Sequence, residues 1–158
     1  MKTASISEIR SELKQTPNNE LLDLCLRLAK HKKENKELLS YLLFDKYNQQ
    51  AFLDALYTDV DEMYEAMNTS SVYYIKKTVR KIIRHINRYI KYASQPKIEV
   101  ELRIYLCSKL QLINKDIQKS VVLKNLYSRE LDRIRKAHAL LHEDLQFDYT
   151  EAINNLEV

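Results

Sequence analysis

The chain contains no glycine among its 158 residues. At an average usage near 7%, about eleven would be expected in a chain of this length. Glycine is the residue that adopts positive φ without steric penalty, so its absence disfavours primed hairpin turns and close backbone approaches to phosphate. The glycine-dependent fingerprints of Rossmann and P-loop nucleotide-binding proteins are therefore excluded. We expect an all-α fold whose helices end at Asn, Ser, Asp or Lys residues.

A chain of 158 residues is the size of one domain and can bury a substantial core. We therefore expect a single all-helical domain over residues 1–158, in which 146–158 form either a short final helix or a frayed tail. The N-terminal residues lack the apolar segment of a secretory signal, and no apolar run reaches about 18 residues, which predicts a cytoplasmic protein with no membrane partner. Cys25 and Cys107 lie among leucines and isoleucines, so both are expected to be buried, reduced thiols.

Apolar residues recur at helical spacing along most of the chain, and polar capping signals divide it into seven or eight helices. Ser5 and Glu8 match the capping-box pattern at the start of the first helix. The pattern from 116 to 145 is also helical, and residues 125–128 predict a break that makes two helices of it. Short loops favour antiparallel pairs, arranged either as an irregular bundle or as a short HEAT-like superhelix.

The segment 97–114 is the one place where the apolar period is ambiguous. Apolar residues alternate from Ile98 to Leu106 as in a half-buried strand, but the same segment also fits a helical stripe. A lone strand would have no partner, because the chain holds no second alternating run and no hairpin turn. A helix is therefore predicted for this segment.

A Leu-rich stretch near the N-terminus, PNNELLDLCLRLAKHKKENKELLSYLLF, covers residues 17–44. It resembles a family of small, uncharacterised all-helical bacterial proteins that begin with a capped short helix and a Leu-rich helical hairpin. The resemblance is confined to the N-terminal third of the chain. It implies an all-α fold and brings no activity with it.

The stretch 71–93 combines an apolar helical seam with a strip of positive charge. Residues 66–98 hold eight bases and no acid, whereas 45–65 hold six acids and one lysine. At about 1.5 Å per residue, a helix over 71–93 would be roughly 35 Å long. Its candidate binding face consists of six basic residues: Lys76, Lys77, Arg80, Lys81, Arg84 and Arg88.

Three interpretations of this basic face remain open. In the first, it lies beside an antiparallel acidic helix over 48–67, which neutralises about half of its charge through weak surface pairs. In the second, it binds an acidic protein partner by charge complementarity. In the third, it binds the phosphates of nucleic acid, and nearby tyrosines stack on bases. Those tyrosines are Tyr73, Tyr74, Tyr89 and Tyr92.

His138 and His142 are four residues apart and would share one helical face, as ligands of a zinc site do. The pattern is not H-E-x-x-H, because Ala139 holds the position of the general base. His138 also continues an apolar stripe, where a partly buried histidine is ordinary. We therefore expect no metal and no cofactor, and no local Ser, Cys or His motif indicates an enzyme.

These observations predict a non-catalytic protein–protein interaction module that uses the basic helical face. Nucleic-acid binding through the same face is the first alternative, and a metal-dependent helical enzyme using His138 and His142 is the second. A homodimer is a further alternative, because the apolar seam of 71–93 could pair with its own copy.

Overall fold

The structure is a computed structural model that describes residues 2–156, apart from the side chain of Asn114. The described residues form nine α-helices and no strand, which confirms the all-α prediction. Seven or eight helices were expected. The chain divides into two compact units, Met1–Phe44 and Asp45–Val158. The single domain expected over 1–158 stays a prediction.

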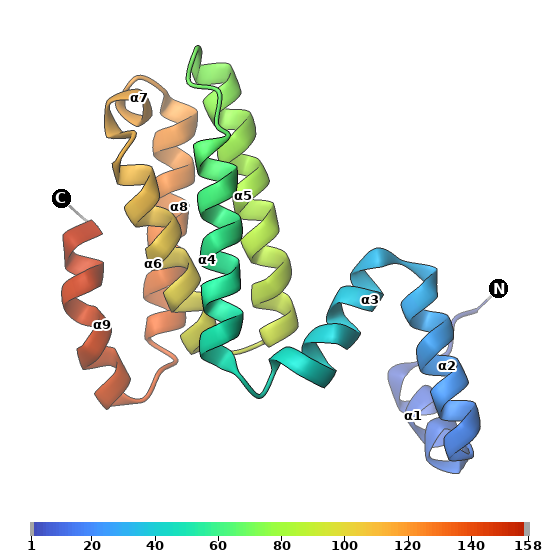
Figure 1. The fold of residues 1–158 in the computed structure, drawn as a ribbon. Helices are drawn as coiled ribbons and strands as arrows, with labels where there is room; N and C mark the ends of the chain where they lie inside the picture. The colour runs from blue at the N-terminus through green and yellow to red at the C-terminus, as the bar shows by residue number, and fades with distance from the viewer. Residues whose placement is uncertain (1, 157–158) are drawn as a thin grey trace. The chain divides into compact units, whose positions relative to one another are not determined.

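The N-terminal unit holds three helices, α1 (Ile6–Gln15), α2 (Asn18–His31) and α3 (Lys33–Ser40), followed by a short π-helical turn, η1 (Tyr41–Asp45), whose last residue belongs to the second unit. The second unit holds the other helices, all labelled in Figure 1: α4 (Gln49–Glu65), α5 (Val72–Ala93), α6 (Pro96–Gln111), α7 (Asn114–Gln118), α8 (Val121–His138) and α9 (Glu143–Leu156).

Helix α1 begins at the predicted capping box. The Glu8 N–H donates to Ser5 Oγ at 3.3 Å, and the Ser5 N–H donates back to Glu8 Oε2 at 2.6 Å. Helices α2 and α3 are separated at Lys32, whose backbone is extended, and they pack against each other as a hairpin. No residue of α1, α2 or α3 is buried. The expectation of a buried Cys25 is therefore wrong, because the thiol lies on the exposed surface of α2.

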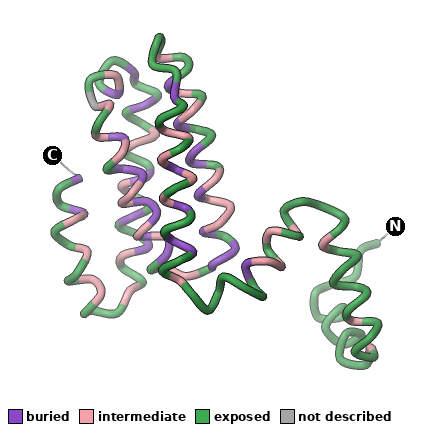
Figure 2. Tube along the Cα trace, viewed as in Figure 1, coloured by how far each residue is buried: buried purple, intermediate pink, exposed green. Residues whose placement is uncertain are grey.

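Helix α6 lies at the centre of the C-terminal unit and contacts α4, α5, α7, α8 and α9. Its buried residues, from Ile98 to Leu110, cover about 200° of its circumference, whereas Lys97 and Ser108 are exposed on the remaining side. Charged residues such as Glu99 and Arg103 fall within this wide buried arc, which explains why the apolar stripe of 97–114 is unclear. Figure 2 shows the buried residues gathered in this unit. In a HEAT-like stack each helix would contact only its neighbours, so the irregular bundle is the arrangement found here.

Side-chain contacts fix the directions of the neighbouring helices. Gln49 at the start of α4 donates to Gln95 Oε1, just beyond the end of α5, at 2.7 Å. Asp59 follows Gln49 by ten residues on α4, and its carboxylate lies 2.9 Å from Nε2 of His85 on α5. His85 precedes Gln95 by ten residues. Residue numbers therefore rise along one helix and fall along the other, which confirms an antiparallel α4–α5 pair.

Helix α9 closes the bundle against α6 and α8. Ile153 and Leu156 are buried in one cluster with Cys107 and Ile134, and the Tyr127 hydroxyl donates to the Leu156 carbonyl at 2.7 Å. Residues 146–156 are therefore a packed part of the final helix and not a frayed tail. Residues 157 and 158, which the expected tail also included, lie outside the described residues.

The break expected at 125–128 is wrong, because these residues lie inside α8. The helix begins earlier, where the Leu123 N–H donates to Ser120 Oγ at 3.4 Å. Asn125 and Ser128 are exposed on its outer side, where polar residues do not interrupt a helix. The chain is interrupted instead at 119–120 and between α8 and α9.

Ser94, the C-cap of α5, is the one non-glycine residue with positive φ among those described, with φ 51° and ψ 38°. Its N–H donates to the Ile90 carbonyl at 2.9 Å, as in a left-handed helix cap. The longest helix of the described residues therefore ends in a left-handed conformation that usually requires glycine, and here a serine adopts it.

We predict that Ser94→Gly raises the free energy of unfolding by about 0.5–1 kcal/mol. Removing Cβ relieves left-handed strain of about 1–2 kcal/mol, and part of that gain is lost to the greater entropy of the unfolded chain. Urea denaturation of the full chain measures the change. Ser94→Val should lower the free energy of unfolding, and a rise in this variant would contradict the explanation.

A buried ion pair joins α6 to α8. Arg103 is 4% exposed and Glu130 1% exposed, and the Arg103 guanidinium donates to the Glu130 carboxylate. Arg103 also pairs with Glu99 at 2.8 Å, and Arg133 pairs with Glu130 at 2.8 Å. Both buried charges are therefore matched, as buried charges must be to persist.

We predict that Glu130→Ala lowers the free energy of unfolding by about 3 kcal/mol or more, because it leaves the Arg103 charge buried beside an empty site. Arg103→Met combined with Glu130→Leu should recover more than half of that loss. Asp132→Ala is the control, since it removes only the exposed pair with Arg135 on the same helix and should change stability by less than about 1 kcal/mol. A double variant no more stable than Glu130→Ala would contradict this account.

Candidate functional site

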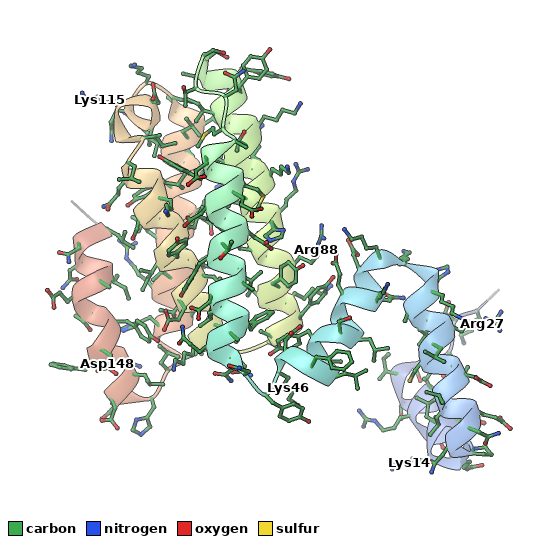
Figure 3. The ribbon with its side chains drawn as sticks, in the orientation of Figure 1. Lys14, Arg27, Lys46, Arg88, Lys115 and Asp148 are labelled. Atoms are coloured by element: carbon green, nitrogen blue, oxygen red, sulfur yellow. The ribbon has the colours of Figure 1, made fainter. Side chains whose placement is uncertain are left out.

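The six basic residues predicted as a binding face all lie on α5. Lys77, Arg80, Lys81 and Arg84 are exposed, and Lys76 and Arg88 are partly buried. Figure 3 shows nitrogen-tipped side chains projecting from this helix. Within residues 2–156, no acidic side chain forms an ion pair with any of five of these cations: Lys76, Lys77, Arg80, Lys81 and Arg84.

Two of the acids of α4 meet other partners. Asp59 pairs with His85, and Asp61 pairs with Lys109 of α6 at 2.7 Å. Arg80 lies five residues before His85, which places the two about 140° apart around α5. Arg80 is therefore turned away from the side of α5 that meets Asp59, whereas Lys81, four residues before His85, lies only about 40° from it. Among the described residues, the expected pairs between the acidic helix and these five cations do not form.

Four of the six cations border one groove of about 490 Å³ between α5 and α8, namely Lys76, Lys77, Arg80 and Arg84. Its apolar lining comes from Ile83, which is 8% exposed, and from Leu126 of α8; Tyr73 completes the lining. Lys81 and Arg88 do not line it. We call this feature the basic groove: Tyr73, Lys76, Lys77, Arg80, Ile83, Arg84 and Leu126.

Positive charge continues beyond the groove along α8. Arg129 is exposed and lies three residues after Leu126, on the same side of that helix. An anionic ligand in the basic groove would therefore experience a field from both walls, and the apolar floor would exclude water from part of its surface.

The four tyrosines expected beside the basic face separate into two pairs. Tyr73 is 64% exposed and Tyr74 44% exposed, and their rings meet edge to face with centroids 5.4 Å apart. Tyr92 is buried, and Tyr89 packs against it and against His85. The first pair is the exposed one, and of these four tyrosines only Tyr73 lines the groove.

The two histidines considered as metal ligands make separate local contacts. His138 Nε2 donates to the Gln146 carbonyl at 2.8 Å, which ties the end of α8 to α9. His142 is exposed and lies 3.3 Å from the Asp144 carboxylate. In the part of the chain that the structure describes, no three His, Cys, Asp or Glu side chains are grouped closely enough to hold a metal ion.

A cluster of tyrosines and carboxylates, which the sequence analysis missed, joins α4, α6 and α9. Tyr57 and Tyr149 both donate to the Glu101 carboxylate, and Tyr105 donates to Asp61 at 2.7 Å. Burial, together with the Glu101 charge, raises the pKa of Tyr57 and Tyr149 above the ordinary range, so both remain protonated donors.

A sequence signal for this cluster exists in hindsight. Tyr57 and Asp61 are four residues apart on α4, and Glu101 and Tyr105 are four apart on α6. When two parallel helices lie side by side, these spacings place Tyr57 opposite Glu101 and Asp61 opposite Tyr105. Helices α4 and α6 run parallel, and both contacts form. The rings of Tyr57 and Tyr105 stack with centroids 4.2 Å apart. The cluster therefore holds these three helices together.

Comparisons with known proteins add no further information on this site, because no family model, curated protein or solved structure matches the chain. Over the described residues, none of the helices combines the length and the apolar character needed to cross a bilayer. The resemblance of residues 17–44 to small all-helical bacterial proteins stays a prediction.

Proposed function

We propose that the protein is a non-catalytic interaction module whose basic groove binds an acidic, partly apolar segment of another protein. The observation that carries the proposal is the grouping of four cations, none of them in an ion pair within the described residues, around an apolar floor. The cations would select carboxylates, and Ile83 and Leu126 would accept an apolar side chain between them.

The geometry of α5 supports a helical ligand. Lys76, Arg80 and Arg84 follow each other at intervals of four residues, which places them about 6 Å apart along the axis. Carboxylates at intervals of four residues on a partner helix have the same spacing, and leucines between them would face the floor. Amphipathic helices bind grooves in other proteins in this way, with apolar anchors and a charged rim.

The test uses a peptide with glutamates at intervals of four residues and leucines on the adjoining face. We predict that Arg80→Glu combined with Arg84→Glu weakens its binding to the full chain at least tenfold, because two attractions become repulsions worth about 1.4 kcal/mol or more together. Fluorescence anisotropy of the labelled peptide measures the affinity.

The matched control is Lys97→Glu combined with Lys115→Glu, which changes net charge equally at two exposed positions outside the groove. It should weaken binding less than about threefold, because charges beyond a Debye length are largely screened. Equal losses in the two double variants would show that net charge alone attracts the peptide, and the groove would not be the site.

Nucleic acid is the second candidate, and the exposed Tyr73 and Tyr74 beside the cations favour it. If the four groove cations contact phosphates of a single strand, log K should fall with log salt at a slope of about −3. Oligonucleotide titrations at several salt concentrations measure this slope. The proposed ligand would become nucleic acid if an oligonucleotide bound more tightly than the peptide and showed this slope. Its binding should also weaken in the variant that combines Arg80→Glu with Arg84→Glu.

A further inference from the structure

Helix α9, which closes the bundle, turns a strip of negative charge away from it. Over Glu143–Leu156 the helix contains four acidic residues and no lysine or arginine. Three of the acids, Asp144, Asp148 and Glu151, are exposed and lie within about 60° around the helix. They are about 140–180° from Ile153, which is buried where α9 packs on the bundle. The three carboxylates therefore face outward from the C-terminal unit.

An aromatic side chain borders these acids. Phe147 is 83% exposed and lies about 60° around α9 from Asp144. Within residues 2–156, Asp148 and Glu151 form no ion pair, and the contact of Asp144 with His142 at 3.3 Å is an exposed and therefore weak one. This surface is thus acidic and partly apolar, as the ligand of the basic groove should be. We call it the acidic face: Asp144, Phe147, Asp148 and Glu151.

The spacing of the acids matches the spacing of the groove cations when the two helices run in opposite directions. Along α9, the second acid follows the first by four residues and the third follows the second by three. Along α5, counted backwards from Arg84, Arg80 comes after four residues and Lys77 after three more. An antiparallel α9 can therefore place all three acids opposite cations at once. The opposed pairs are Asp144 with Arg84, Asp148 with Arg80, and Glu151 with Lys77.

The same direction brings the aromatic ring to the apolar floor of the groove. Ile83 lies on the side of the α5 cations that borders α8, where Leu126 completes the floor. When an antiparallel α9 turns its acids towards α5, the sense of a right-handed helix puts Phe147 on the side of α8. A parallel α9 would direct Phe147 to the opposite side. Charge spacing and apolar contact therefore favour the same orientation.

We propose that the basic groove of one copy of the chain binds the acidic face of a second copy, with that α9 antiparallel to α5. This inference rests on the proposed function and names a partner that carries the required segment. A copy cannot fill its own groove in this way, because Ile153 and Leu156 hold α9 against the bundle with its acids turned outward. Since the two surfaces differ, the contact is head to tail, and successive copies form a ring or an open chain.

The first measurement is the average molar mass of the full chain at low salt, by sedimentation over a range of concentrations. We expect the mass to rise above 18.8 kDa as the concentration increases. Asp144→Arg combined with Asp148→Arg should keep it at 18.8 kDa, because attraction to the groove cations becomes repulsion. The matched control is Glu62→Arg combined with Glu65→Arg, which changes net charge equally at two exposed positions of α4 and should associate like the wild type. Circular dichroism confirms that each variant keeps its helices.

A charge swap distinguishes a second copy from any other partner. Arg80→Glu combined with Arg84→Glu should also abolish association, because the groove then repels the acidic face. A variant that carries these two changes together with Asp144→Arg and Asp148→Arg has both opposed pairs reversed, so it should associate again. Failure of this fourfold variant to recover would overturn the proposed pairing.

Phe147→Ala tests the apolar part of the contact. Burial of the ring in the groove predicts that its removal weakens association about tenfold. The urea midpoint of the same variant should not fall, because a side chain that is 83% exposed contributes little to the stability of a single copy. Association as strong as that of the wild type would show that Phe147 is not in the contact and would overturn the proposed orientation.

The peptide titration described above separates failure of this inference from failure of the proposed function. If the peptide binds the groove but the chain stays at 18.8 kDa at every concentration, the proposed function holds and the self-association is wrong. If neither is observed, both are wrong. Association that persists in Arg80→Glu combined with Arg84→Glu would show that another surface joins the copies, and this inference would be wrong.

Discussion

The enclosure of α6 is the constraint on which the rest of the C-terminal unit depends. Five helices contact it, and its buried residues cover more than half of its circumference. A helix enclosed to this extent buries some of the polar groups that its sequence contains. Arg103 is such a group, and its charge is tolerated only because Glu130 of α8 and Glu99 of its own helix supply carboxylates. The ion pair therefore fixes the register of α6 against α8 as well as satisfying the charge.

This enclosure also produces the candidate site. Helix α5 packs on α6 and on α4, and these contacts occupy the sides that carry Ile75, Ile82 and His85. The remaining side of α5 carries the cations, and it meets α8 only at its edge, where Leu126 borders the basic groove. The groove is thus the space left between two helices that both rest on a third. Cations with long stems are suited to such a position, because their methylenes cover apolar surface while their charges remain in water.

Much of this architecture could be predicted from sequence because it depends on local patterns. The regular apolar seam of α5 predicted its length and its basic face, and the absence of glycine predicted helices in place of hairpins. Glu130 shows the limit, because it looks like any surface glutamate in a charged helix and becomes a buried anion only through a partner 27 residues away. The acids of α4 show the same limit, since their spacing predicted charge on one side of a helix but not which neighbour would meet it.

The basic groove attracts its ligand mainly through charge, and a Debye length of about 8 Å at physiological salt limits that attraction to ligands close by. Its apolar floor of Ile83 and Leu126 offers contact area whose contribution salt does not screen. Added salt should therefore weaken the attraction of the cations for an acidic ligand and leave the apolar contacts of that ligand in place.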